Sequence, residues 1–271
     1  MRSKLIFLDI DGTLVGFDGK MPESTRAVLG RAVEEGHHLI VSTGRLAAQV
    51  YPWLFEKAIF DGFISSSGAN IKWKGEQVAC NFWSHDQVKR FCEAAASVGA
   101  AVFGHTETNL IAEPGAVEHQ VSFFAKFGLE RWQFQSLLDN VLVADPCGYP
   151  NIEKGIYIDS GHSVAEMQAL LGDEFKVDGY SFGPIPPTSG EVTLAGVSKA
   201  SAIEVLCDYL GVGIEDTVAI GDGSNDIEMV KRAGCGIAMG NGVEELKAVA
   251  DHVCGRIEED GLAAAFERWI L

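Results

Sequence analysis

The fold of this chain is decided by the stretch LIFLDIDGT at residues 5–13. Its first four residues are bulky and apolar, which is typical of a strand buried on both faces of a parallel sheet. Two carboxylates, Asp9 and Asp11, follow at the carboxyl end of this strand. Side chains two apart on an extended chain point the same way, so both acids are expected to face one pocket. An isolated Asp-x-Asp-Gly is also common at a solvated strand-to-turn junction, so the interpretation depends on the rest of the chain.

Two further predicted strands also end in polar residues. Residues 38–42 form an apolar run followed by TGR at residues 43–45, where a new helix is expected to begin. A hydroxyl, a glycine and the free N–H groups of a helix start make an anion site. On its own, an ordinary N-cap by Thr43 is the commoner explanation. Residues 217–220 form another apolar run, followed by the acid-bearing GDGSND at residues 221–226.

Strands and amphipathic helices alternate over most of the chain, which predicts an α/β fold with a parallel sheet covered by helices on both faces. The predicted strands are 5–8, 38–42, 217–220 and 236–239, with a strand meeting a turn at 60–69; the predicted helices are 22–36, 199–210, 227–233, 244–250 and 261–271.

The pattern changes from about Trp83 onward, where shorter elements follow one another. Helices are predicted at 86–98 and 164–171, and strands at 101–103, 109–112, 141–144 and 155–158; a Gly/Pro-rich stretch follows through 179–190. This segment predicts an inserted α+β domain at residues 82–185 within a core formed by residues 1–81 and 186–271. Linkers are expected near Asn81 and residues 186–190. The aromatic and polar residues Phe103, His105, Tyr180 and Phe182 are expected to belong to the core of the insert.

Composition excludes several classes of partner. The chain has 271 residues and a net charge of −17, which argues against binding nucleic acid or an anionic membrane by general electrostatics. No apolar stretch approaches the ~20 residues that span a bilayer, and the start resembles no signal peptide. The six scattered cysteines form no Cys-x-x-Cys pair, which predicts reduced thiols and a cytoplasmic location. The sequence gives no indication of the oligomeric state.

The polar residues at the strand ends form one coherent set. In an open parallel sheet the carboxyl ends of the strands converge on the ligand crevice. There the three carboxylates of Asp9, Asp11 and Asp222 make a hard oxygen site suited to Mg²⁺. Hydrogen-bond donors and a positive charge for a phosphoryl group come from Thr43, the Gly44 N–H, Lys199 and Asn225. No calcium loop, dinucleotide fingerprint or phosphate-binding P-loop has matching spacing.

These motifs together resemble those of haloacid dehalogenase-like phosphatases of the Cof-like group. The matching segments are residues 9–13, 43–45, 196–199, 221–226 and 238–241. The resemblance implies a Rossmann-like core with a large α/β cap inserted between Thr43 and Lys199. Two positions depart from the family pattern: Ser67 stands where Asn is usual, and Ser42 where alanine is common.

The resemblance also implies a mechanism. Asp9 would attack phosphorus and form an aspartyl-phosphate, and Asp11 would protonate the leaving group and then activate water. Mg²⁺ would be held by Asp9, the Asp11 carbonyl and Asp222, since a carboxylate approaches a phosphate dianion only where cations offset the repulsion. Thr43 and Asn225 would hydrogen-bond the phosphate beside Lys199. Asp226 would orient Lys199 or metal-bound water, or would be an ordinary helix-start acid.

Three functions are consistent with this pattern. The first is a Mg²⁺-dependent phosphatase that acts on small phosphorylated metabolites such as sugar phosphates. The second is a phosphotransferase or mutase on the same core, similar to phosphomannomutase, which passes the phosphoryl group to a sugar. The third is a metabolite-binding module with little turnover, although such a module has no need of both Asp9 and Asp11. The sequence names no substrate, because the insert is expected to select it and matches no motif.

Overall fold

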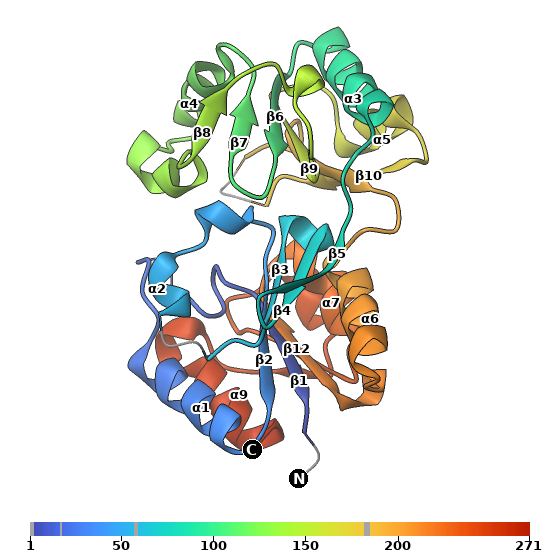
Figure 1. The fold of residues 1–271 in the computed structure, drawn as a ribbon. Coiled ribbons are helices and arrows are strands. Elements are labelled where there is room, and N and C mark those ends of the chain that lie inside the picture. The colour runs from blue at the N-terminus through green and yellow to red at the C-terminus, as the bar shows by residue number, and fades with distance from the viewer. Residues whose placement is uncertain (1–2, 17, 57–58, 182–184) are drawn as a thin grey trace. The chain divides into compact units, whose positions relative to one another are not determined.

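The chain forms two compact units in a computed structural model that describes residues 3–16, 18–56, 59–181 and 185–271. Unit 1 consists of Met1–Gly44, Tyr51–Ala79 and Ser198–Leu271, and unit 2 of Arg45–Val50 and Cys80–Val197. Figure 1 shows the elements of each unit. The α/β class predicted from the sequence is confirmed.

Unit 1 is built on a sheet with the strand order β14-β13-β12-β1-β2-β3-β4-β5. The strands are β1 (Leu5–Leu8), β2 (His38–Ser42), β3 (Gly62–Ser65), β4 (Asn70–Trp73), β5 (Glu76–Cys80), β12 (Thr217–Gly221), β13 (Cys235–Ala238) and β14 (His252–Val253). From β14 to β3 every neighbouring pair is parallel, whereas β4 runs antiparallel to β3.

The strand order reverses beside β1. From β1 the chain continues outward through β2 and β3 on one side, while β12, β13 and β14 extend on the other. Leu8 lies opposite Ile220 of β12 and Val41 of β2, so the three strands end nearly level. In a doubly wound sheet, ligands bind outside the carboxyl ends of the strands at such a reversal. The acid-bearing stretch therefore emerges at the topological switch point.

Helices cover both faces of this sheet (Figure 1). The helices of unit 1 are α1 (Glu23–Glu34), α2 (Pro52–Phe55), α6 (Lys199–Leu210), α7 (Ile227–Arg232), α8 (Glu244–Lys247) and α9 (Gly261–Trp269). On one face, Ile203 of α6 and Met229 of α7 share a core with Phe7 of β1 and Ile40 of β2. The two helices α1 and α9 pack against each other on the opposite face.

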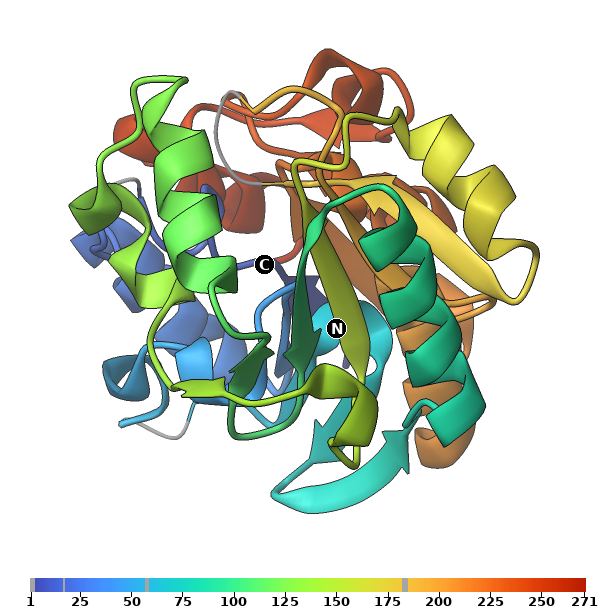
Figure 2. The ribbon, with the colours of Figure 1, turned by 90° about the horizontal axis from the view of Figure 1, so that it is seen from above.

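Unit 2 contains a mixed sheet with the strand order β10-β11-β9-β6-β7-β8. Its strands are β6 (Ala101–His105), β7 (Leu110–Ala112), β8 (Val141–Val143), β9 (Lys154–Ile158), β10 (Phe175–Gly179) and β11 (Gly190–Leu194); its helices are α3 (His85–Ser97), α4 (Ala116–Ala125) and α5 (Val164–Leu171). Figure 2 shows α3 and α5 on one side of the strands and α4 on the other. Phe91 and Met167 pack on the first face and Phe124 on the second, so this sheet is buried on both sides.

The bounds of unit 2 differ from those of the insert expected from the sequence, residues 82–185, at the segments that connect it to unit 1. The strands β10 and β11 pair antiparallel across the Gly/Pro-rich stretch, so unit 2 extends to Val197. The sequence predicts no strand there, because the loop between the two strands is rich in glycine and proline. Residues 182–184 of that loop, including Phe182, lie outside the described residues. A second difference is that Arg45–Val50 belongs to unit 2.

No helix in the described part of the chain is long and apolar enough to cross a membrane.

Candidate active site

Asp9 is the first residue after β1 and is held in line with the sheet. Its main-chain N–H donates to the carbonyl of Ile220 at 3.1 Å, which continues the pairing of β1 with β12. Its side chain is nearly buried, with the residue 7% exposed. A carboxylate buried at the end of a core strand is costly unless a cation or a hydrogen-bond donor compensates it. Asp9 therefore needs a positive partner, and the structure supplies one.

That partner is Lys199, the first residue of α6. Its Nζ lies 2.6 Å from Oδ1 of Asp9 and 2.7 Å from Oδ1 of Asp226. Ser198 caps α6 with its side chain, and so fixes where the helix starts. The Lys199 ammonium lies at the positive end of the helix dipole, which is unfavourable for a cation. The carboxylates of Asp9 and Asp226 offset this unfavourable interaction. The structure thus brings Lys199 to Asp9, although 190 residues separate them in sequence.

The loop after β12 brings two more carboxylates to this point. One carboxylate oxygen from each of Asp9, Asp222 and Asp226 lies within 4.8 Å of the others. Asp226 is fully buried, and its Oδ2 accepts hydrogen bonds from the N–H groups of Asp222 and Gly223. Asp226 therefore shapes the loop that carries Asp222 while it holds Lys199. Such a set of oxygen donors suits Mg²⁺.

Asp11 is placed differently from these three carboxylates. The chain turns tightly after Asp9, with the N–H groups of Leu14 and Val15 both donating to the carbonyl of Ile10. In this turn Asp11 is exposed, and it is not part of the carboxylate group found among the described residues. The sequence placed three carboxylates together as Asp9, Asp11 and Asp222, whereas Asp226 is the third side chain of the group. The metal ligand implied for Asp11 was its main-chain carbonyl, which stays a prediction.

Gly12 lets this turn approach Asp222 closely. Its φ is +88°, a conformation that favours glycine, and a Cβ added there would overlap the Asp222 carboxylate. Thr13, the next residue, donates from Oγ1 to Oδ1 of Asp222 at 2.9 Å. The two acid-bearing loops are therefore joined directly, side chain to side chain.

The charges of this cluster are out of balance. Burial raises the pKa of Asp222 to about 7, and the nearby Asp226 carboxylate adds to the shift. Burial also raises the pKa of Asp9 well above its ordinary value, although Lys199 opposes the change. Burial alone would lower the pKa of Lys199, but Asp226 and Asp9 outweigh it and raise this pKa. Three carboxylates facing one ammonium leave a site that favours a further cation.

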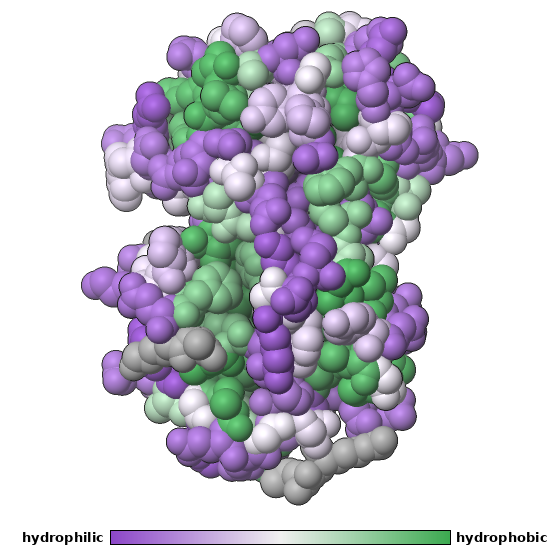
Figure 3. Space-filling view, viewed as in Figure 1, coloured by the Kyte–Doolittle hydropathy of each residue, from purple (hydrophilic) through white to green (hydrophobic). Residues whose placement is uncertain are grey.

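The rest of the chain does not supply general attraction for a phosphate. Hydrophilic side chains are spread over the face of the molecule in Figure 3, with smaller apolar patches between them. Acidic residues outnumber basic ones, so the net charge is −17. An anionic ligand therefore depends on local positive charge, and Lys199 supplies it inside the carboxylate cluster.

Thr43 and Gly44 follow β2, next to β1 in the sheet. Thr43 is buried, its N–H donates to the Ile64 carbonyl, and its own carbonyl accepts from the N–H of Ser67. The helix expected to begin at residues 43–45 is wrong: the next helical turn is a three-residue 3₁₀ helix, Ala47–Gln49.

The chain leaves unit 1 at this point instead of starting a helix. Leu46 is buried in the core of unit 2, and the Arg45 guanidinium donates to the Gln49 carbonyl and to Oγ of Ser136, both at 3.4 Å. The chain bends at Gly44 and Arg45, and Leu46 has an extended backbone conformation. Gly44 thus lies next to Thr43 but not at the start of a helix.

Asn225 lies partly buried in the 3₁₀ turn Ser224–Asp226, between Asp222 and α7. It therefore belongs to the same loop as two of the clustered carboxylates. All four predicted phosphate-binding residues either follow β2 and β12, the two neighbours of β1 in the sheet, or start α6.

The turn at Ser67 supports the start of α6. Ser67 has φ 58° and ψ 31°, which is a left-handed conformation. Asn is several-fold enriched in this conformation, which explains why the family pattern usually has Asn where this chain has Ser67. Gly68 has φ +105°, and a Cβ added to it would overlap the carbonyl of Ser198. The turn therefore contacts the residue just before Lys199. Sequence reasoning missed this role of Gly68, because the contact spans a long separation along the chain.

A second polar cluster lies in unit 2. Lys154 is 1% exposed, and its Nζ lies 2.5 Å from Oε2 of Glu191, whose Oε1 accepts from the Ser181 hydroxyl. His105 pairs with Lys154 across β6 and β9, and its Nδ1 is buried without a hydrogen-bond partner among the described residues. Burial lowers the pKa of His105 well below its ordinary value, so the ring is neutral. The sequence predicts that His105 is a core residue. It is buried, but beside the charged side chain of Lys154.

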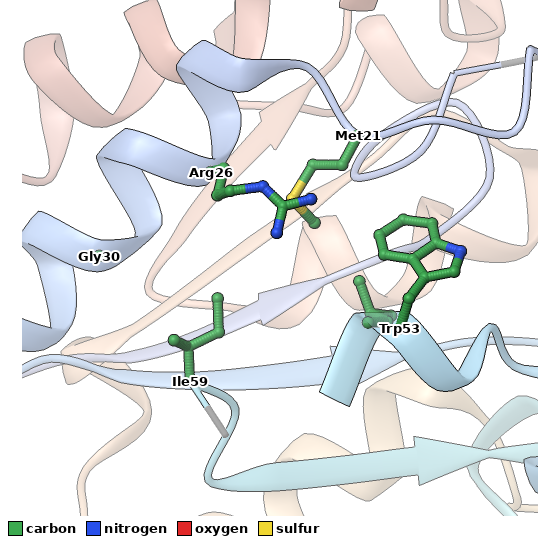
Figure 4. Close-up of a pocket in the computed structure, with 6 residues that line it drawn as sticks. Met21, Arg26, Gly30, Trp53 and Ile59 are labelled. Atoms are coloured by element: carbon green, nitrogen blue, oxygen red, sulfur yellow. The ribbon is translucent and has the colours of Figure 1, made fainter. Parts of the chain in front are cut away.

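A pocket elsewhere in unit 1 holds none of the predicted site residues. Met21, Arg26 and Gly30 line it from α1 and the segment before it, with Trp53, Leu54 and Ile59 opposite. Figure 4 shows the Arg26 guanidinium beside the Met21 side chain and near the Trp53 ring. The described residues that line this pocket include no carboxylate, so the candidate active site remains the cluster at the switch point.

Comparisons with known proteins agree with this geometry. Residues 6–266 match the sequence pattern of a family described as haloacid dehalogenase-like hydrolase. The relative YkrA of Bacillus subtilis (strain 168) is 30% identical over 275 residues, which cover 98% of this chain and 97% of YkrA. From the same organism, 5-amino-6-(5-phospho-D-ribitylamino)uracil phosphatase YcsE is 26% identical over 272 residues, covering 99% of this chain and 96% of YcsE.

Among solved structures, the subclass IIB sugar phosphatase BT4131 is similar over 98% of this chain and 99% of its own, with a TM-score of 0.80 and 25% sequence identity. The similarity extends over both units, so the insert as well as the sheet of unit 1 has a counterpart there.

Proposed function

Because the chain belongs to the haloacid dehalogenase-like hydrolase family, we propose that this phosphatase is Mg²⁺-dependent and hydrolyses small phosphorylated metabolites through an aspartyl-phosphate. The observation that carries the proposal is the meeting of Asp9, Asp222, Asp226 and Lys199 at the switch point of the sheet. Sugar phosphates and similar phosphomonoesters are the proposed substrate class.

The donor set fits the metal. Hard oxygen ligands at one point suit Mg²⁺, and the surplus of carboxylates over ammonium groups favours a further cation. The Asp9 and Asp222 carboxylates and the Asp11 carbonyl would hold it. When bound, Mg²⁺ supplies positive charge that offsets the repulsion between the Asp9 carboxylate and a phosphate dianion.

The nucleophile of the first step is Asp9. One of its carboxylate oxygens bonds to phosphorus as the bond from phosphorus to the ester oxygen breaks. Asp11 gives a proton to the departing alkoxide, and its exposure suits exchange of that proton with water. Lys199 favours the ionised form of Asp9 and holds its carboxylate in place. Thr43, the Gly44 N–H and Asn225 hydrogen-bond the phosphoryl oxygens, whose charge grows in the transition state.

In the second step water is the nucleophile. Asp11, now a carboxylate, takes a proton from the water as its oxygen attacks phosphorus. The bond from phosphorus to Asp9 breaks, which releases inorganic phosphate and restores both carboxyl groups to their starting states.

Unit 2 is proposed to be the substrate-selecting cap, while unit 1 performs the chemistry. All the groups with assigned chemical roles belong to unit 1. The buried Lys154–Glu191 pair, with His105 beside it, gives unit 2 polar groups of its own that suit recognition of a hydroxylated leaving group. Glu191→Gln is expected to change the ranking of sugar phosphates while hydrolysis of a small aryl phosphate stays near wild type. An equal loss of turnover on all substrates would contradict this division of roles between unit 1 and unit 2.

The experiment that tests the function is a screen of phosphorylated metabolites for phosphate release, run on wild type, Asp9→Asn and Asp86→Asn. Asp86 is an exposed residue in the first turn of α3 and serves as the matched control. Wild type and Asp86→Asn should release phosphate from the same substrates, and Asp9→Asn from none. Phosphate transfer to an added sugar instead of water would favour a mutase, and turnover by Asp9→Asn would exclude the covalent route.

A further inference from the structure

Asn241 lies between the two acid-bearing loops and has no role in the proposed reaction so far. It belongs to the turn that follows β13. Its Nδ2 lies 2.9 Å from the carbonyl oxygen of Gly12 and 3.4 Å from Oδ2 of Asp222. Its Oδ1 accepts a hydrogen bond from the N–H of Ile257 at 2.9 Å. One side chain thus contacts three separate loops.

The orientation of the Asn241 amide is fixed by its neighbours. The N–H of Ile257 requires an acceptor, which places the amide oxygen on that side. The amide nitrogen must then face Gly12 and Asp222, both of which offer only oxygen acceptors. The reverse orientation would set a donor against a donor and an acceptor against a carboxylate.

The turn that carries Asn241 is itself fastened to the Asp222 loop. The N–H of Met239 donates to the Gly221 carbonyl at 2.9 Å, and the N–H of Val243 donates to the Asp222 carbonyl at 3.0 Å. On the other side, the N–H of Gly240 donates to the Gly255 carbonyl at 2.9 Å. Main-chain hydrogen bonds on both sides give Asn241 a rigid base.

Two side chains therefore hold the Asp222 carboxylate from different loops. Thr13 donates to Oδ1 and Asn241 to Oδ2. Each carboxylate oxygen has two lone pairs, so both donations leave room for a cation. Asn241 also holds the Gly12 carbonyl, one peptide away from the Asp11 carbonyl in the same tight turn.

We propose that Asn241 is a positioning residue for the cation site: it sets the separation between the turn of Asp11 and the carboxylate of Asp222. The inference rests on the proposed Mg²⁺ dependence. Groups that orient metal ligands contribute strongly to affinity, so removing the Asn241 amide is expected to weaken cation binding by about 10- to 100-fold.

The test compares Asn241→Ala and Asn241→Asp with wild type. Binding of Mn²⁺ is measured by calorimetry without substrate, and phosphate release is measured over a range of Mg²⁺ concentrations. Asn241→Ala should bind Mn²⁺ at least about tenfold more weakly and need correspondingly more Mg²⁺ for half-maximal turnover. Its KM at saturating Mg²⁺ should stay close to wild type, because Asn241 has no assigned contact with substrate.

Asn241→Asp separates positioning from support of the fold. Its carboxylate still accepts from the N–H of Ile257 but has no donor for the Gly12 carbonyl. It should unfold near the wild-type temperature and yet need at least about tenfold more Mg²⁺ than wild type for half-maximal turnover. This variant decides the question if Asn241→Ala does not fold.

The matched control is Asn109→Asp in unit 2, where an Asn side chain also donates to a main-chain carbonyl, that of Asn140. It should keep wild-type Mn²⁺ affinity and turnover. Folded Asn241→Ala with Mn²⁺ affinity within twofold of wild type, or Asn241→Asp with the wild-type Mg²⁺ requirement, would overturn the proposal. If wild type itself works fully in chelator, the proposed Mg²⁺ dependence fails first, and the two failures are distinguishable.

Discussion

Lys199 and Asp226 form an ion pair with both side chains almost completely buried, at 1% and 0% exposed. The Lys199 ammonium lies 2.7 Å from Oδ1 of Asp226, while Oδ2 of Asp226 accepts from two N–H groups of the Asp222 loop. Asp226 thus connects the start of α6 with the loop after β12. Of the roles left open for Asp226 by the sequence, orientation of Lys199 is the one that this geometry favours.

The first prediction concerns this ion pair. Removing one partner of a buried pair leaves an uncompensated charge, so Lys199→Met is expected to lower the free energy of unfolding by about 3–5 kcal/mol in metal-free protein. Urea denaturation measures the change. The control Lys89→Met removes an exposed pair with Glu93 and should cost less than about 1 kcal/mol. Equal losses in the two variants would contradict the electrostatic account of the cluster.

The second prediction concerns the turn beneath α6. Gly68→Ala places a Cβ against the Ser198 carbonyl and so displaces the start of the helix that carries Lys199. Gly75→Ala is the matched control, because Gly75 also has a positive φ but has no atom within 4 Å of an added Cβ. Gly68→Ala should lose about 1–3 kcal/mol more stability than the control and should also lose turnover. Denaturation measures the change in stability, and phosphate release measures the change in turnover. If Gly75→Ala loses as much turnover as Gly68→Ala, the contact between Gly68 and Ser198 does not position Lys199.

The third prediction concerns Ser42, whose hydroxyl is buried without a hydrogen-bond partner among the described residues. An unsatisfied buried polar group costs about 1–3 kcal/mol, so Ser42→Ala is expected to leave the fold as stable as wild type or more stable. Thermal unfolding measures the shift. A clear loss of stability would mean that the hydroxyl has a partner, such as bound water.

The fourth prediction concerns the cation. Chelator should stop phosphate release, Mg²⁺ should restore it, and Ca²⁺ should not, since Ca²⁺ takes more ligands at longer distances. Asp222→Ala should raise the Mg²⁺ requirement, because it removes a carboxylate of the cluster. An unchanged Mg²⁺ titration for Asp222→Ala would remove that residue from the metal site.

Much of this arrangement was predictable from sequence, because it depends on strands that end in polar residues. Apolar runs gave β1, β2 and β12 within one residue, and the doubly wound pattern predicted that their carboxyl ends converge. The family resemblance, built on the motifs at those ends, is confirmed by the family match.

What the sequence did not predict depends on contacts between distant segments. The partnership of Asp226 with Lys199, the contact of Gly68 with Ser198 and the triple contact of Asn241 leave no local pattern. The expected helix after Thr43 was wrong because residues 45 and 46 pack in unit 2, and long-range packing overrides the local signal.

The measurement that tests the account most directly is to locate the phosphoryl group on the protein. The variant Asp11→Asn should still be phosphorylated by an aryl phosphate, whose leaving group needs no proton, but should lack the base that activates water. Acid quenching followed by tandem mass spectrometry should then find the phosphoryl group on Asp9. Phosphate release without any phosphoryl group on Asp9, or a phosphoryl group on another residue, would contradict the proposal that Asp9 is the nucleophile.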